Sequence, residues 1–450
     1  MNFFPQLPEP TSENTSTHTQ EEKQTPILYC NIYFTRYPVQ YCIALPMTPS
    51  SYVRVGSHGD KPCVVLGNTA LQVKVATTGC QIVSVTTHGG GANPLWTPPW
   101  RTTTAALRKV AALDDALFSR RPEDALESEL LACIGGHSLC CDVFGKHSAG
   151  EVSRAGLSFH GEAGLSEFVV TSVGSGGEDG GSTDGSTSST VTLTADLRES
   201  MLRVSRTFTL CPRGSPVVKV TETITNLAGF QRAMGRSQHV SLDMTQRARR
   251  FNTNARRGLT WPEDNGAASL WAVGAEFDVK EGVPRKDGGR DDWFRFPRKD
   301  APRQSDLCTL HVPGADRYGW FTCATDDDVL CYLWERETFP WLMTWEEHCA
   351  RDQPPWGGRT SVRGLEFGSY ALALGRQKNV EMGTLFGTPT FEWLDAHEMK
   401  TTHFFVSLQA LEGVGGAGGG GAADRPASAL EMEDGGGAYA SSEGVRIELF

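Results

Sequence analysis

The sequence lacks the patterns that mark several common classes of protein. Its 12 cysteines form no C-x-x-C pair and no regular spacing, so neither a zinc ribbon nor a disulfide framework is indicated. Free thiols in a reducing compartment are the simplest interpretation, and we therefore predict a cytoplasmic protein. No P-loop and no alternation of strands with helices is present, so no nucleotide cofactor is expected.

Basic residues are outnumbered by acidic ones. The chain has 42 basic and 53 acidic residues, a net charge of -11, which argues against a nucleic-acid or anionic-membrane partner. Residues 1–24 have neither the basic start nor the apolar core of a secretory signal. The apolar run from Ile27 to Met47 is interrupted by Arg36, Pro38 and Gln40, so we do not expect it to span a membrane.

What is present is a long series of short strand-like runs separated by turn residues. In Leu71–Val75 apolar and polar residues alternate strictly, and residues 217–226 form a long run rich in Val, Ile and Thr. We therefore predict an all-β protein, a large antiparallel β-sandwich, over residues 59–412. The remaining segments are a flexible N-terminal extension (1–58), a helical insertion (about 103–131), a Gly/Ser-rich loop (174–190) and a Gly-rich low-complexity tail (413–450).

One stretch, from Trp345 to Tyr370, has the composition of a binding site. It contains two tryptophans, a Pro-Pro-Trp corner, three arginines and Glu366 within a short apolar run. Aromatic walls, arginine donors and a half-buried carboxylate suit a polar, ring-shaped ligand such as a sugar. The alternative is an ordinary loop with core tryptophans, and the same choice applies to Trp96 in the Gly- and Pro-rich loop 88–100.

Three ionisable residues stand in distinctive surroundings. They are His160 in F-H-G-E-A, His239 in Q-H-V-S-L-D and Glu366 in R-G-L-E-F-G. A histidine can serve as acid and base near neutrality, and apolar neighbours raise the pKa of a carboxyl group toward that of a general base. Taken singly, each histidine has a structural alternative as a hydrogen-bonded residue of a strand. The acidic residues of the same motifs have one too: Glu162 could cap a turn, and Asp243 could be solvated.

Taken in order, these motifs resemble the aldose 1-epimerase (galactose mutarotase-like) superfamily, in particular its divergent members. The resemblance is carried by G-G-H-S-L-C-C-D (135–142), F-H-G-E-A (159–163), H-V-S-L-D (239–243) and P-P-W…R-G-L-E-F-G (354–368), with N-P-L-W-T-P-P-W (93–100) in support. It implies a large β supersandwich with a sugar bound in an open cleft on one sheet. It also implies a monosaccharide or sugar-phosphate substrate and no cofactor or metal.

The resemblance also assigns roles to residues. Glu366 matches the base that removes the proton of the C1 hydroxyl, His239 the acid that protonates the ring oxygen, and His160 a second histidine beside that oxygen. The ring then opens and recloses on its other face. The expected substrate-binding residues are His137, Asp142, Glu162, Asp243, Trp345, Trp356, Arg363 and Trp96.

Two other functions remain open at this point. A non-catalytic carbohydrate-binding protein of the same fold would keep the cleft without turnover. A metal-dependent β-barrel enzyme would use His137, His160 and His239, although their spacing fits no common ligand motif. Nothing in the sequence indicates an oligomeric state.

Overall fold

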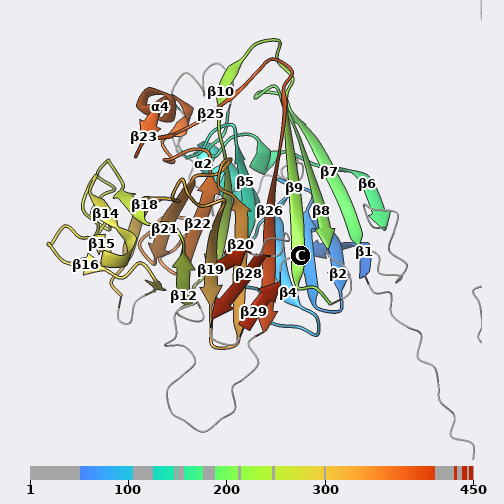
Figure 1. Cartoon of the computed structure of the whole chain (residues 1–450), viewed down its shortest axis with the longest axis horizontal. Coiled ribbons are helices and arrows are strands. Elements are labelled where there is room, and N and C mark those ends of the chain that lie inside the picture. Colours follow the sequence, from blue (N-terminus) through green and yellow to red (C-terminus); the bar gives the residue numbers. More distant parts are fainter. Residues whose placement is uncertain are drawn as a thin grey trace, which may run out of the picture. The chain divides into compact units, whose positions relative to one another are not determined.

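The computed structural model consists of two large antiparallel sheets packed face to face (Figure 1). The structure describes residues 51–104, 125–145, 148, 157–175, 188–210, 214–245, 249–297, 301–410, 430–432, 438–442 and 445–448. The predicted all-β architecture of antiparallel sheets is confirmed. Within this part of the chain, neither α-helix has the length and apolar character needed to cross a bilayer.

The first sheet carries the candidate site on its outer face. Across the described residues it has eleven strands, in the spatial order β1 (Ser51–His58), β2 (Lys61–Asn68), β3 (Leu71–Ala76), β4 (Ile82–Thr87), β5 (His137–Cys141), β11 (Arg236–Asp243), β22 (Ser361–Gly368), β21 (Trp341–His348), β18 (Gln304–His311), β13 (Arg257–Thr260) and β14 (Glu276–Asp278).

The second sheet supports the first from behind. Its nine described strands run in the order β17 (Arg295–Phe296), β12 (Arg249–Thr253), β19 (Tyr318–Ala324), β20 (Asp328–Glu335), β26 (Met399–Ala410), β9 (Val217–Asn226), β8 (Leu202–Leu210), β7 (Ser189–Leu197) and β6 (Val169–Ser175). In β7, β8 and β9 every second residue is buried, because one face meets the other sheet and the other faces solvent. Figure 1 shows these strands side by side with β26.

Several smaller elements accompany the two sheets. The short pairs are β10 (Arg232–Met234) with β25 (Glu392–Leu394), β15 (Val283–Pro284) with β16 (Arg290–Asp291), and β23 (Thr384–Leu385) with β24 (Thr388–Pro389). The helical elements are α2 (Ala125–Cys133), α4 (Gly375–Met382), and the 3-10 turns η2 (Ala163–Leu165) and η3 (Val279–Glu281). The predicted helical insertion thus includes α2, while residues 105–124 lie outside the described residues.

The core lies between the two sheets and is rich in aromatic rings. Phe367 of β22 stacks on Trp334 of β20 with ring centroids 4.4 Å apart, and meets Phe404 of β26 at 5.5 Å. All three side chains are fully buried. Burying a side chain of this size contributes roughly 1.5–3 kcal/mol, so this layer fixes the position of β22 firmly.

Two boundaries differ from the sequence prediction. Residues 51–58, assigned to the flexible extension, form β1 and pair along their whole length with β2. The reason is the two-residue turn Gly59-Asp60, whose glycine adopts a φ of +56° and closes a tight hairpin. The low-complexity tail likewise contains β27 (Leu430–Met432), β28 (Ala438–Ser442) and β29 (Val445–Glu448). Residues 1–50, 176–187 and 411–429 lie outside the described residues.

Candidate functional site

Two of the predicted catalytic residues form a buried pair in the middle of the first sheet. His239 of β11 and Glu366 of β22 stand directly opposite each other in the strand register. Nε2 of His239 lies 3.1 Å from Oε1 of Glu366, and each residue is only 3% exposed. Directly opposite residues on adjacent strands share a face of the sheet, which is why two groups 127 positions apart in the sequence meet.

The carboxylate of Glu366 occupies a space that a glycine leaves free. Gly364 precedes Glu366 by two residues and therefore lies on the same face. A Cβ added at Gly364 would lie 2.4 Å from Oε1 of Glu366 and 3.3 Å from atoms of Trp345. The carboxylate thus folds back along its own strand, and the glycine is a requirement of this geometry.

The third predicted catalytic residue reaches the pair from a turn. His160 adopts a φ of +63°, and its ring centroid lies 5.2 Å from that of His239. The turn is held by the backbone, because N–H of His160 donates to O of Gly145 and N–H of Glu162 donates to O of Cys141. Nδ1 of His160 accepts a hydrogen bond from N–H of Gly145 at 3.1 Å. His160 is partly exposed, in contrast to the pair.

Burial shifts the titration of all three groups. It raises the pKa of Glu366 well above its usual value and lowers the pKa of His239 to about 4. Burial also lowers the pKa of His160 well below its usual value, with the nearby His239 as a second cause. Desolvation disfavours the charged form of each group, so the site favours states in which the His239–Glu366 pair carries no net charge.

An aromatic layer covers this pair. Trp96, Trp100, Trp345 and Trp356, here called the tryptophan cluster, are all buried. Trp356 stacks on Trp96 at 6.1 Å, and Trp345 presents an edge to His239 at 6.1 Å. The guanidinium of Arg351 lies over the rings of both Trp345 and Trp356. The faces of Trp96 and Trp356 are thus occupied by protein, and the expected open cleft is covered in this structure.

Helix α2 is part of the same cover and is tied to the sheet at its C-terminal end. The buried ammonium of Lys61 donates to the carbonyl oxygens of Cys133 and Ile134, the latter at 3.2 Å. Burial lowers the pKa of Lys61 to about 8. Nε1 of Trp100 donates to O of Leu131 at 2.8 Å. These contacts satisfy carbonyls that a helix end leaves without partners.

Two predicted binding residues face away from the site. Arg363 lies three positions before Glu366 on β22, and an odd spacing on a strand puts the two side chains on opposite faces. It pairs with Glu346 at 3.2 Å in the core, among Phe251, Trp293 and Phe296. His137 also faces the core: its register partner is Val240, and its ring contacts Gln238 and Tyr332.

Three predicted carboxylates serve the framework. Asp142 is fully buried and pairs with Arg232 and with Arg376 of α4. Asp243 accepts bonds from the backbone and hydroxyl of Thr245 at the end of β11. Glu162 accepts three backbone N–H groups, at 2.9, 3.0 and 3.0 Å, from residues 198–200 in the turn between β7 and β8. These contacts favour a framework role for all three, and the substrate-binding role expected from the sequence stays a prediction.

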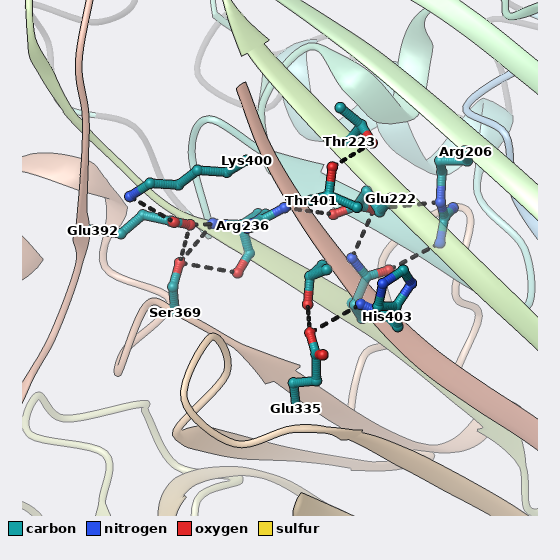
Figure 2. A network of polar contacts seen from close by, with 12 residues as sticks. Arg206, Glu222, Thr223, Arg236, Glu335, Ser369, Glu392, Lys400, Thr401 and His403 are labelled. Carbon is teal, nitrogen blue, oxygen red and sulfur yellow. Dashed lines mark hydrogen bonds and ion pairs between the residues drawn. The ribbon is translucent and has the colours of Figure 1, made fainter. Parts of the chain in front are cut away.

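A polar network in the core supports β11 from behind the site. Arg206 and Arg236 both pair with Glu222, at 3.3 and 3.4 Å, and all three are fully buried (Figure 2). Gln238, the neighbour of His239, donates to Glu222 and accepts from Arg206, both at 3.0 Å. The strand that carries His239 is therefore anchored through its opposite face.

One residue beside the pair was missed in the sequence analysis. Ser241 lies two positions after His239 on β11, and its Oγ is 3.2 Å from Nδ1 of His239. The alternation of a strand was enough to place both side chains on one face, so this neighbour could have been found. Among the described residues, no group of His, Cys, Asp and Glu side chains is arranged to hold a metal ion.

Comparison with a solved structure confirms the predicted galactose mutarotase-like fold. No family model and no curated protein matches the sequence. The structure is similar to that of a candidate aldose 1-epimerase from Klebsiella pneumoniae, with 12% identity, coverage of 79% of this chain and 82% of that chain, and a TM-score of 0.53. A galactose mutarotase-like protein from Clostridium acetobutylicum matches at 10% identity over 81% of this chain and 100% of its own, with a TM-score of 0.49.

Proposed function

Starting from the galactose mutarotase-like fold of this chain, we propose that it interconverts the α and β anomers of a hexose or hexose phosphate. The observation that carries the proposal is the contact between Nε2 of His239 and Oε1 of Glu366, with His160 beside it. An acid and a base that share one proton can open and close a hemiacetal without any further group.

At rest the shared proton lies on Glu366, because burial disfavours both charged forms, and the proposed reaction proceeds through the form in which this proton has moved to Nε2 of His239 and Glu366 is ionised. Glu366 accepts the proton of the C1 hydroxyl while Nε2 donates its proton to the ring oxygen. The bond between C1 and the ring oxygen breaks and C1 becomes an aldehyde carbon. After rotation about the bond between C1 and C2, the reverse transfers reclose the ring on the other face and return both protons.

His160 is assigned a binding role. Because Nδ1 accepts from N–H of Gly145, the neutral ring carries its proton on Nε2 and can only donate from there. A sugar oxygen beside His239 is a suitable acceptor. His160 is also the partly exposed member of the group, so we propose that the sugar approaches from its side and displaces part of the aromatic cover.

The test is anomer exchange measured by two-dimensional NMR on glucose, galactose and their 6-phosphates, in weak buffer that limits spontaneous mutarotation. Glu366→Gln and His239→Gln should each lower the catalysed rate at least about 100-fold, since each removes a proton-transfer partner. The surface variant Glu276→Gln is the matched control. An unchanged rate in Glu366→Gln would refute the assignment of the base.

A non-catalytic carbohydrate-binding protein is the second candidate. It is favoured by the low exposure of the His239–Glu366 pair, which limits the access of a bound sugar to these two groups. Ligand-observed NMR with the same four sugars separates the two functions. Saturation transfer to a sugar without faster anomer exchange would support binding alone.

A further inference from the structure

The hydrogen bonds of a histidine reveal which ring nitrogen carries the proton, and three buried or partly buried histidines can be compared in this way. A neutral imidazole has one donor and one acceptor nitrogen. The tautomer of His160 follows from its contact with Gly145. N–H of Gly145 donates to Nδ1 of His160, so the ring proton of His160 lies on Nε2.

The tautomer of His137 follows from the polar network in the core. Oε1 of Gln238 accepts from Arg206 while its amide nitrogen donates to Glu222, so the orientation of this amide is fixed. Nε2 of His137 lies 3.0 Å from that oxygen and must be the donor. Nδ1 of His137 accepts from the hydroxyl of Tyr332 at 3.3 Å. His137 and His160 therefore share the same tautomer.

His239 has the opposite arrangement of partners. Nε2 faces the carboxylate of Glu366 at 3.1 Å, and Nδ1 faces the hydroxyl of Ser241 at 3.2 Å. Burial favours a pair without net charge, which holds one proton between Nε2 and Oε1. The proton that belongs to the ring itself then lies on Nδ1. A hydroxyl can accept it, because its own hydrogen rotates to suit.

We propose that Ser241 is a positioning residue whose hydroxyl oxygen accepts the Nδ1–H of His239 and thereby keeps Nε2 as the nitrogen that exchanges a proton with Glu366. The catalytic meaning of this inference rests on the proposed function, but the tautomer can be measured without it. In both protonation states of the pair, Nδ1–H stays bonded to Ser241 while the second proton moves. Loss of this acceptor removes the hydroxyl partner of the buried Nδ1–H, which shifts the ring toward the Nε2–H tautomer, and that tautomer cannot accept from Glu366.

Besides Ser241, the ring of His239 has a hydrogen bond to its own backbone, and no carboxylate faces Nδ1 among the described contacts. The titratable groups that face the pair are His160 from the turn at 157–162, at 5.2 Å between rings, and Cys140 of β5, whose thiol pKa is raised by burial and by the nearby Glu366. Ser241 is itself fully buried, and its backbone is held by N–H of Trp96 and O of Gly136. Its hydroxyl is therefore placed by the strand and by the cover together.

Ser237 provides a matched control. It lies on the same strand and the same face as Ser241, two residues on the other side of His239, and is equally buried. Its hydroxyl has no hydrogen-bond partner within the described part of the chain. Ser237→Ala therefore removes the same atom from the same environment without touching Nδ1 of His239.

The experiment is long-range ¹H–¹⁵N NMR of the histidine rings in the full chain labelled with ¹⁵N-histidine, with the His239 signal identified by its absence in His239→Gln. We expect wild type and Ser237→Ala to show His239 protonated on Nδ1, and His160 protonated on Nε2 as an internal reference. Ser241→Ala should show His239 protonated on Nε2, and Ser241→Thr, which keeps the hydroxyl, should restore the Nδ1–H form.

Kinetics provide the second measurement. Ser241→Ala should lower kcat for anomer exchange by about 10- to 100-fold with little change in KM, whereas Ser237→Ala should leave both unchanged. A wild-type spectrum with His239 protonated on Nε2 overturns the proposal, whatever the variants do. So does a Ser241→Ala protein with unchanged tautomer and unchanged kcat. A wild-type protein without anomer exchange but with the Nδ1–H tautomer refutes the proposed function and leaves the tautomer assignment standing.

Discussion

Gly364→Ala tests the placement of Glu366 most directly, because it alters one atom next to the carboxylate. The added Cβ would lie 2.4 Å from Oε1 of Glu366, about 1 Å closer than an ordinary contact. The backbone of β22 is fixed by pairing on both sides, so the carboxylate is the group that moves. A shift of this size would lengthen its 3.1 Å contact with His239 to about 4 Å and break the hydrogen bond.

The expected effects on activity and on stability differ. A displacement of about 1 Å in a reacting group costs on the order of 100-fold in rate, equivalent to about 2.7 kcal/mol in transition-state free energy. The free energy of unfolding should change by less than about 1 kcal/mol, because alanine in a strand reduces the entropy of the unfolded chain and the displaced atom ends a flexible side chain. We therefore expect a folded but slow variant.

The assay combines anomer exchange by NMR with urea unfolding followed by tryptophan fluorescence. Gly135→Ala is the matched control, because its added Cβ would meet only ordinary contacts, at 3.7 Å from Lys61 and 4.0 Å from Pro98. The reasoning is refuted if Gly364→Ala keeps kcat within about threefold of wild type. It is also refuted if the variant loses several kcal/mol of stability, since the strand and not the carboxylate would then have moved.

Four further predictions concern stability and pH. Arg363→Met should lower the free energy of unfolding by about 3 kcal/mol in urea titrations, because it leaves Glu346 charged and fully buried, and Arg363→Met/Glu346→Leu should recover most of that loss. Activity should stay level from neutral pH down to about 5 and fall as pH approaches about 4, because His239 takes up a further proton there. A midpoint near 6.5 in the pH–rate profile would contradict the argument that burial lowers the pKa of His239. Because the unfolded chain binds that proton first, His239 should also make stability decrease as pH falls from 6.5 to about 4, measurable by thermal unfolding. Glu162→Ala should cost about 1 kcal/mol, since it removes an acceptor of three backbone N–H groups, and should leave kcat unchanged.

The sequence predicted the fold through strand periodicity, and the order of its motifs singled out His239 and Glu366, which the structure brings into contact. Strict alternation identified strands such as Leu71–Val75, and it would also have separated Arg363 from Glu366, had their odd spacing been considered. His137 could not be placed in this way. Its face depends on the register between β5 and β11, which long-range pairing decides and local sequence does not.

The layer that covers the His239–Glu366 pair, made of the tryptophan cluster and helix α2, was less predictable still. Tryptophans suit a sugar platform and a hydrophobic cluster equally well, and only the packing of Trp96 on Trp356 shows that their faces are occupied. Similarly, a buried lysine is rare, and nothing near Lys61 in the sequence indicates that its ammonium holds the end of α2, 72 residues away.

The aromatic cage around Arg363 has a consequence for how such a protein can change over time. Strand β22 is held against the second sheet by Arg363 on one face and presents Glu366 on the other. The surface that carries Glu366, here called the floor of the site, is therefore as rigid as the interior. On the proposed function, a change in sugar selectivity is therefore expected to come from the loops above this face. Exchanging those loops between relatives should transfer selectivity while the floor, and the chemistry fixed on it, stays the same.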